Sequence, residues 1–176
     1  GRVPRATGNN VTSPRPSATD WYETVKLNWG YHFVDPSLSE YEPVPRTWAQ
    51  MDAIVAFWQS KGVDGFRVDF AHWVPQRAWR WLLDRARERR EDTYFLAEAY
   101  EDLEGLLDAG FDAVYHDEAY DTLKRIYGGA ATLDDLDALL LAIGDRRRAS
   151  WAMYLENHDE KRIGAPVVRG GDVGAS

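Results

Sequence analysis

The chain has no cysteine and no long apolar run, and each absence removes a class of protein. With no cysteine among its 176 residues, it has no disulfide framework. No apolar run approaches the length of a membrane-spanning helix. Basic side chains are too few to balance the acidic ones, 21 against 29, so the net charge is -8. This charge attracts neither nucleic acid nor an anionic membrane, and a neutral or cationic substrate fits it better.

Histidine is also scarce, and the four present form no close pair, so we do not expect a structural zinc site. No signal peptide is visible, but the chain begins with Gly1 rather than Met, which leaves the localisation open. What the chain does contain is 44% apolar and 28% charged residues, the composition of a globular protein with one sizeable core. Most of its abundant aromatic residues are expected to pack in that core.

Composition and hydrophobic periodicity divide the chain into three parts. Residues 1–45 are rich in Gly, Pro, Ser, Thr and Asn and predict an irregular segment, with a lid over a site as one role. Residues 46–164 alternate between strand and helix patterns, and residues 165–176 predict a loose tail. Strands are expected at 64–70, 94–98, 111–115 and 151–155. A first helix is expected to begin at a capping box, Thr47–Gln50. Further helices are expected around 79–86, 103–107 and 123–126, and a last one is expected to begin at Thr132.

Strands that alternate with helices predict a parallel α/β sheet with right-handed crossovers. About four such units fit into the chain, whereas a complete (β/α)8 barrel usually needs ~250 residues. The pattern therefore predicts either a small open sheet or part of a larger TIM barrel.

Three acidic residues follow three of the expected strands: Asp69, Glu98 and Asp159. Because the carboxyl ends of parallel strands meet at one edge of a sheet, side chains at these ends come together. Three carboxyl groups at such an edge are a plausible arrangement for cleaving a glycosidic bond.

Arg67 precedes Asp69 by two residues, so both side chains should lie on the inner face of an extended strand, opposite Phe66, Val68 and Phe70. A hydrogen bond from Arg67 would hold Asp69 ionised, as a nucleophile requires. The alternative is a structural ion pair at a strand end.

Glu98 ends an uncharged run, Thr93 to Ala97. Desolvation at the edge of an apolar strand favours the neutral carboxyl, as a general acid requires. The alternative is an exposed strand terminus.

Asn157 and His158 precede Asp159 and could donate hydrogen bonds to ligand hydroxyls, although Asn and Asp are also common in turns and caps. His72 could bind a sugar or satisfy a backbone carbonyl, and Trp73 offers a flat face to a pyranose ring.

Three segments, GFRVDFAHW, FLAEAY and YLENHDEKR, resemble in order and spacing the signature segments of the α-amylase family of retaining glycoside hydrolases, family 13. The resemblance implies a (β/α)8 barrel, with Asp69 after the fourth strand as nucleophile and Glu98 after the fifth as general acid/base. It implies Asp159 after the seventh strand as transition-state stabiliser. Arg67 would orient Asp69, and His158 would bind sugar hydroxyls.

The chain departs from the family pattern in two places. The Asp-x-x-x-Asn-His segment that closes the third strand is absent, so the chain resembles the middle of a barrel, about strands 4–7. That segment often contributes to calcium binding, so a structural calcium is possible in the full-length protein but is not supported by this segment. His72 and Trp73 stand where many members carry Lys-His, so acceptor-side contacts are not carried over.

The predicted function is retaining hydrolysis of α-glucosidic, mainly α-1,4, linkages in an α-glucan or maltooligosaccharide, with no cofactor needed for the chemistry. Nucleic acid and membrane partners are not expected. The alternatives are a transglycosylase that uses the same residues, a Mg²⁺ enzyme with Asp69, Glu98 and Asp117 as ligands, and a truncated barrel fragment without activity. An incomplete barrel leaves strand edges unpaired, which favours aggregation.

Overall fold

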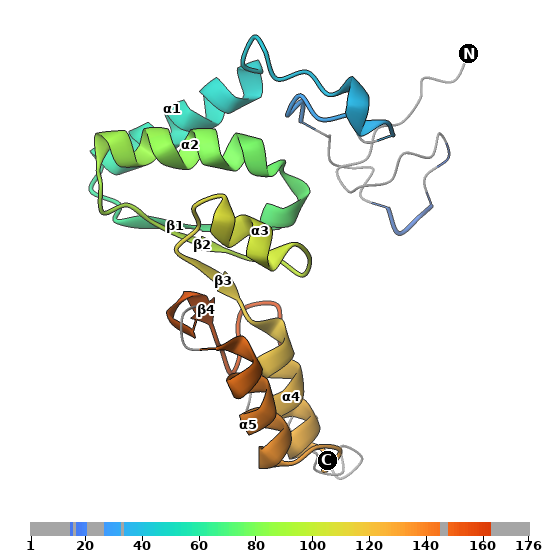
Figure 1. The fold of residues 1–176 in the computed structure, drawn as a ribbon. Coiled ribbons are helices and arrows are strands. Elements are labelled where there is room, and N and C mark those ends of the chain that lie inside the picture. Colours follow the sequence, from blue (N-terminus) through green and yellow to red (C-terminus); the bar gives the residue numbers. More distant parts are fainter. Residues whose placement is uncertain (1–14, 16, 21–26, 33, 145–147, 163–176) are drawn as a thin grey trace. The chain divides into compact units, whose positions relative to one another are not determined.

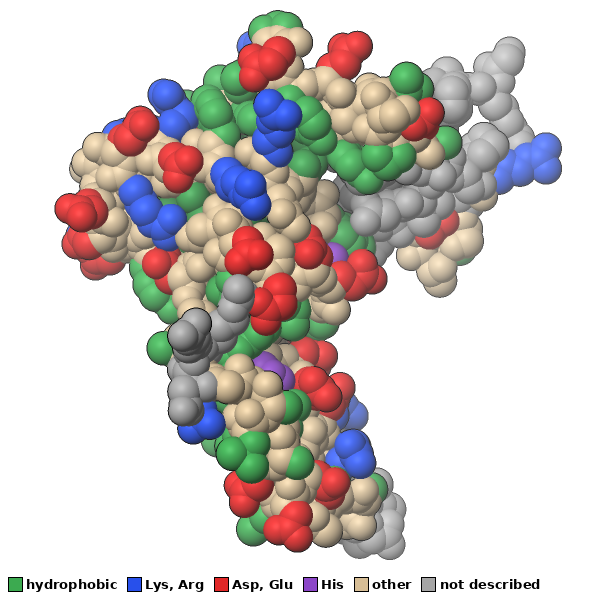
Figure 2. Space-filling view, viewed as in Figure 1, with side chains coloured by type: hydrophobic (Ala, Val, Ile, Leu, Met, Phe, Trp, Pro, Cys, Tyr) green, Lys and Arg blue, Asp and Glu red, His purple; other side chains and the backbone are tan. Residues whose placement is uncertain are grey.

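The computed structural model describes residues 15, 17–20, 27–32, 34–144 and 148–162. They form two compact units, which are described separately (Figure 1). The first unit takes in residues up to Phe66 together with His72–Thr93, and the second takes in Arg67–Ala71 together with the chain from Tyr94 onward. On the face that Figure 2 shows, Asp and Glu side chains are spread over both units, in keeping with the net negative charge.

The first unit is built on two α-helices that lie side by side, α1 (Arg46–Ser60) and α2 (Gln76–Arg89) (Figure 1). Short 3-10 turns lie at η1 (Pro36–Leu38) and η2 (Ala71–Trp73), the latter beginning in the second unit. Apolar residues recur at helical spacing and are buried: Trp48 and Val55 from α1, and Ala78, Trp79, Leu82, Leu83 and Ala86 from α2. The predicted capping box at Thr47 is wrong, because α1 already begins at Arg46 and its N-cap, Pro45, has no side-chain oxygen.

Charged and aromatic side chains hold the first unit together. Asp52 on α1 is only 8% exposed, and it accepts from Arg85 Nε at 2.9 Å and pairs with Arg89 Nη1 at 2.6 Å, both on α2. The buried indole of Trp48 donates to the carbonyl of Trp29 at 3.0 Å. These aromatic and acidic residues therefore have structural roles, as expected for most of the aromatic content.

The second unit contains the sheet, in which four strands follow the order β1-β2-β3-β4. They are β1 (Gly65–Val68, whose last two residues belong to this unit), β2 (Tyr94–Ala97), β3 (Ala113–Tyr115) and β4 (Trp151–Ala152). β2 pairs with β3 and β3 with β4 in parallel. The connections carry α3 (Leu103–Asp108), α4 (Asp117–Tyr127), α5 (Leu133–Ile143) and the 3-10 turn η3 (Arg148–Ser150). The predicted parallel α/β architecture is confirmed.

Apolar side chains from strands and helices form the core of the second unit: Phe95, Ala97, Leu106, Phe111, Val114 and Tyr120. α4 and α5 run side by side (Figure 1). α5 begins as predicted at Thr132, which forms a capping box with Asp135. None of the helices in the described ranges combines the length and the apolar character that crossing a bilayer requires.

All four strands are shorter than predicted, and β1 and β4 differ most. β1 ends at Val68, so Asp69 and Phe70 lie in a turn, and the expected alternation of faces stops before them. Phe70 has a left-handed backbone, with φ of 44°, and its N–H donates to Oε2 of Glu98 at 3.0 Å. The turn is thus held by the acid at the end of the next strand. β4 likewise ends at Ala152 rather than continuing to Leu155.

The first 45 residues contain only η1 as a helical element within their described part, namely positions 15, 17–20, 27–32 and 34–45. Their role as a lid stays a prediction. The predicted tail, residues 165–176, lies outside the described residues.

Candidate active site

Glu98 is the buried centre of the candidate site. It directly follows β2 and is 2% exposed. Its Oε2 accepts from the Phe70 N–H at 3.0 Å, and its Oε1 accepts from the Tyr100 hydroxyl at 3.0 Å. Nη2 of Arg67 lies 3.3 Å from the same Oε1. The acid is buried, so the alternative of an exposed strand terminus is wrong. Its surroundings are polar rather than apolar, because a guanidinium and two hydrogen-bond donors meet its oxygens, and its role as general acid stays a prediction.

Arg67 joins the two candidate catalytic carboxylates. Its Nη1 donates to Oδ1 of Asp69, while its Nη2 faces Glu98, so one guanidinium contacts both. Its guanidinium also lies over the ring of Tyr115, 5.5 Å from the centroid. Desolvation would lower the pKa of Arg67, but hydrogen bonds with Tyr115 and Asp69 and the charge of Glu98 outweigh it, so the pKa is raised and the cation is permanent.

Asp69 is the exposed member of this pair. The predicted ion pair with Arg67 is present, but the side chain is 69% exposed rather than turned inward along a strand, because β1 has already ended. An exposed carboxylate beside a fixed cation is accessible to a ligand from solution. Asp69 and Glu98 therefore differ in access to water while sharing one positive charge.

The segment 157–159 forms a turn that its own asparagine stabilises. Oδ1 of Asn157 accepts from the backbone N–H groups of Asp159 and Glu160, both at 2.9 Å. The turn interpretation of Asn157 is thus confirmed. Nε2 of His158 lies 3.1 Å from Oδ2 of Asp159, and the two side chains are 66% and 56% exposed.

Tyr100 donates to the buried acid, and its own pKa is raised. Burial raises the pKa of Tyr100, and so do its hydrogen bond to Glu98 and the charges of Glu98, Asp117 and Asp159. The structure brings Asp69 and Glu98 into contact with Arg67. The role of Asp159 beside them stays a prediction.

Tyrosines are the site residues that the sequence reasoning missed. Tyr100 donates to Glu98 although no motif marks it, and the Tyr154 hydroxyl donates to Oδ1 of Asp117 at 2.5 Å. Burial and this hydrogen bond raise the pKa of Tyr154. Tyr120 stacks on Tyr154 with ring centroids 5.1 Å apart. The available signal was the position of Tyr100, two residues after a strand-ending acid in a chain with nine tyrosines.

Two further predictions concern metals and sugar contacts. Within the described part of the chain, no group of three or more His, Asp or Glu side chains is arranged to hold a metal ion, so the Mg²⁺ alternative has no donor set there. His72 and Trp73 belong to the first unit, where their rings meet edge-on with centroids 5.8 Å apart. Their contact with a substrate stays a prediction.

Fold and site together define a parallel α/β protein with a carboxylate pair at its strand ends. No protein-family model matches the chain. The chain is 30% identical over 161 residues to the α-amylase MalA of Haloarcula japonica, covering 86% of this chain and 23% of that protein. It is also 40% identical over 53 residues to an α-1,4-glucan:maltose-1-phosphate maltosyltransferase of Myxococcus xanthus, covering 30% of this chain and 8% of that protein.

Among solved structures, an α-amylase from Lactobacillus plantarum is similar with a TM-score of 0.55 and 26% identity, over 66% of this chain and 31% of that chain. The chain belongs to the α-amylase family of glycoside hydrolases. It spans about a quarter of the length of the curated α-amylase that it matches.

Proposed function

We propose that this chain supplies the catalytic carboxylates of a retaining glycoside hydrolase that cleaves α-glucosidic, mainly α-1,4, linkages in starch-like oligo- or polysaccharides. The observation that carries the proposal is the single guanidinium of Arg67 in contact with both Asp69 and Glu98. A retaining mechanism needs two carboxyl groups about 5–5.5 Å apart, and a shared guanidinium holds two carboxyls close together without letting them touch.

The two carboxyls have environments suited to different roles. Asp69, exposed and paired with Arg67, is the nucleophile that attacks the anomeric carbon and forms a covalent glycosyl ester. Glu98, buried at the strand end, gives its proton to the glycosidic oxygen of the leaving sugar. Glu98 then takes a proton from water, which displaces the ester and releases a sugar with retained configuration.

The remaining predicted residues contact the sugar in this proposal. Asp159 stabilises the positive charge that develops on the reacting sugar ring, and His158 and Asn157 lie beside it. His72 and Trp73 follow Asp69 in the chain and are proposed as further substrate contacts. The chemistry uses carboxyl groups and water alone, so it needs no cofactor.

The test is release of reducing sugar from soluble starch by the complete protein that contains this chain. Asp69→Asn should lower kcat by at least about 10³-fold, because an amide cannot form the glycosyl ester. Glu101→Gln, which changes a nearby acid without a role in this mechanism, is the matched control. Proton NMR of the first product should show the α-anomer. Initial release of the β-anomer, or an Asp69→Asn protein with near-normal turnover, contradicts the proposal.

A transglycosylase is the second candidate, because one of the similar proteins is named as a maltosyltransferase. The same glycosyl ester would then be attacked by a sugar hydroxyl in place of water. Chromatography of products formed with excess maltose separates the two: longer oligosaccharides indicate transfer, and shorter products alone indicate hydrolysis.

A truncated fragment without activity was the third hypothesis. Expression of the 176-residue segment alone tests it, because robust starch hydrolysis by the segment would exclude this hypothesis.

A further inference from the structure

Asp159 lies beyond the part of its segment that the sheet holds. The backbone ladder of β4 ends at Ala152, whose carbonyl accepts from the His116 N–H at 3.1 Å. Asp159 comes several residues later, and its side chain is 56% exposed. The Asn157 side chain closes the turn at Asp159 from within the same segment. The position of this turn therefore depends on side-chain contacts between the segment and the rest of the second unit.

Tyr154 makes two kinds of such contact. Its hydroxyl donates to Oδ1 of Asp117, the first residue of α4, at 2.5 Å. Its ring packs on two others, with centroid distances of 5.2 Å to Tyr115 and 5.1 Å to Tyr120. Burial and the hydrogen bond to Asp117 raise the pKa of Tyr154, so the hydroxyl stays a donor beyond the usual tyrosine range. The side chain is thus held at its polar tip and along its ring.

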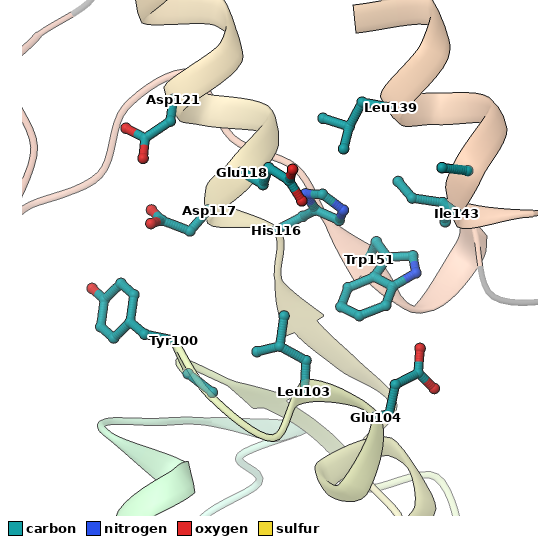
Figure 3. Close-up of a pocket in the computed structure, with 12 residues that line it drawn as sticks. Tyr100, Leu103, Glu104, His116, Asp117, Glu118, Asp121, Leu139, Ile143 and Trp151 are labelled. Carbon is teal, nitrogen blue, oxygen red and sulfur yellow. The ribbon is translucent and has the colours of Figure 1, made fainter.

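Asp117 is a strong acceptor for this hydroxyl. Figure 3 shows Asp117 and His116 projecting from opposite sides of the start of α4. His116 caps the helix by accepting from the Ala119 N–H at 3.1 Å, whereas Asp117 accepts from Tyr154. A negative charge in the first turn of a helix is favoured, and a hydroxyl bonds more strongly to a carboxylate than to a neutral acceptor. This bond therefore ties the segment firmly to α4.

Tyr115 connects Tyr154 to the carboxylate pair. Tyr115 ends β3, and the guanidinium of Arg67 lies 5.5 Å from its ring centroid. The same guanidinium contacts both Asp69 and Glu98. Tyr154 therefore packs against the ring that supports this guanidinium, and its contacts place the segment relative to the two carboxylates.

We infer that Tyr154 is a positioning residue, which holds the segment carrying Asp159 in place for the reaction through its hydrogen bond to Asp117. The inference rests on the proposed function, because Tyr154 affects catalysis here only through Asp159. A carboxylate that stabilises a developing charge must be held in position, and a displacement of about 1 Å can cost much of the rate. Tyr154 itself contacts neither the substrate nor a reacting atom.

The hydroxyl of Tyr120 offers a matched control on the same group of rings. It donates to Oε2 of Glu160, the residue after Asp159, at 2.8 Å. Nζ of Lys124 lies 4.0 Å from the same oxygen, so Glu160 keeps a partner when this hydroxyl is removed. Tyr120→Phe also keeps its ring against Tyr154. It therefore removes one hydroxyl from the group without releasing the segment.

Hydrolysis of a nitrophenyl maltooligosaccharide by the complete protein tests the inference. Tyr154→Phe keeps the ring and loses the donor, so kcat should fall roughly tenfold with KM nearly unchanged, while Tyr120→Phe should leave kcat nearly unchanged. In an Asp159→Asn protein, Tyr154→Phe should cause almost no further loss, because the two residues act as one unit. An equal loss in both backgrounds would overturn the inference, since a general loss of structure lowers both alike.

Substitutions of the acceptor test the hydrogen bond from its other end. Asp117→Leu removes the acceptor and should lower kcat as much as Tyr154→Phe does. Asp117→Asn keeps an amide oxygen that can accept from the hydroxyl, so it should retain about fivefold more activity than Asp117→Leu. Equal losses in the two variants would show that this hydrogen bond does not position the segment.

Hydrogen exchange, followed by NMR on the complete protein, separates this inference from the proposed function. The N–H groups of Asp159 and Glu160, both bonded to Asn157, should exchange roughly tenfold faster in Tyr154→Phe and at the wild-type rate in Tyr127→Phe. Faster exchange in a protein that does not hydrolyse starch would support the anchoring and refute the reaction. Hydrolysis with kcat and exchange both unchanged in Tyr154→Phe would support the reaction and refute the inference.

Discussion

Each of the two units contains a buried acid with arginine partners, and the two acids differ in what surrounds them. In the first unit, Asp52 lies in the middle of a helix, and both of its oxygens pair with arginines of the neighbouring helix. In the second, Glu98 lies at a strand end, where Arg67 also holds the exposed Asp69. A buried carboxylate with a cation is therefore not a functional signal by itself. The nearby exposed carboxylate at the carboxyl edge of a parallel sheet makes the difference.

The largest expected effects come from neutralising each acid in turn. Glu98→Gln should lower the hydrolytic kcat by about 10²–10⁴-fold with little change in stability, because the amide keeps the shape but has no proton to give. Asp52→Asn should instead lower the stability and leave kcat nearly unchanged. It leaves two arginines poorly paired and should cost about 1–3 kcal/mol of unfolding free energy, a value reduced because the arginines are partly exposed.

Urea denaturation and starch hydrolysis, measured on both variants of the complete protein, test this contrast. If Asp52→Asn abolished turnover while remaining folded, the division between a structural and a catalytic carboxylate would be lost.

A smaller effect is expected for the residue that links the catalytic carboxylates. Arg67→Lys keeps the positive charge but has one donor group in place of a planar fork, so it cannot contact Asp69 and Glu98 at once. We expect kcat to fall by about 10²-fold through misplaced carboxylates. Arg77→Lys, in the first unit, is the control. Steady-state kinetics on a maltooligosaccharide give the comparison, and full activity in Arg67→Lys would show that charge alone is sufficient.

Sequence reasoning predicted the parts of this site that depend on strand order. Asp69 and Glu98 follow successive strands, and parallel pairing brings such ends together whatever the loops do. Sequence reasoning failed where a single backbone angle determines the position of a side chain. The left-handed turn at Phe70 ends β1 early and exposes Asp69, and no residue type at that position signals it, since a left-handed phenylalanine is rare.

Tyr100 was missed for a related reason. β2 ends at Ala97, so Tyr100 lies outside the strand, and the alternation of faces that placed Arg67 beside Asp69 does not fix where its hydroxyl points. The helix start at Thr132 was predicted from neighbours in sequence, although the same kind of reasoning wrongly placed a capping box at Thr47. The tyrosine contacts depend instead on loops.

Tyr100→Phe sharpens the same comparison with a modest effect. Removing the hydroxyl takes one donor from Glu98, and we expect kcat/KM to fall roughly tenfold. Because the pKa of Tyr100 is raised by burial and by Glu98, the hydroxyl stays protonated beyond the usual tyrosine range. The ratio of wild-type to variant rates should therefore be the same at about pH 6 and about pH 9. A ratio that collapses towards one at the higher pH would show that the donor is lost there. Tyr127→Phe, at an exposed tyrosine, is the control.

The smallest effect is expected at Tyr120, a buried residue of the second unit away from the carboxylate pair. Its hydroxyl donates to Oε2 of Glu160 at 2.8 Å, and burial together with this bond raises the pKa of Tyr120 to about 12. A raised pKa means that the folded state favours the neutral phenol. This contribution is complete below the unfolded value near pH 10 and is lost as the pH rises towards about 12. Tyr120→Phe should cost about 1 kcal/mol near neutral pH.

Between about pH 10 and pH 12 the wild-type protein should lose the contribution of this hydrogen bond, which Tyr120→Phe does not have. The unfolding free energies of the wild type and the variant should therefore converge over this range. Denaturant titrations across this range test the convergence. A constant difference would show that packing, rather than the hydrogen bond to Glu160, accounts for the loss. Starch hydrolysis should be nearly unchanged in Tyr120→Phe, which would distinguish a tyrosine that stabilises the second unit from Tyr100, which acts on its catalytic acid.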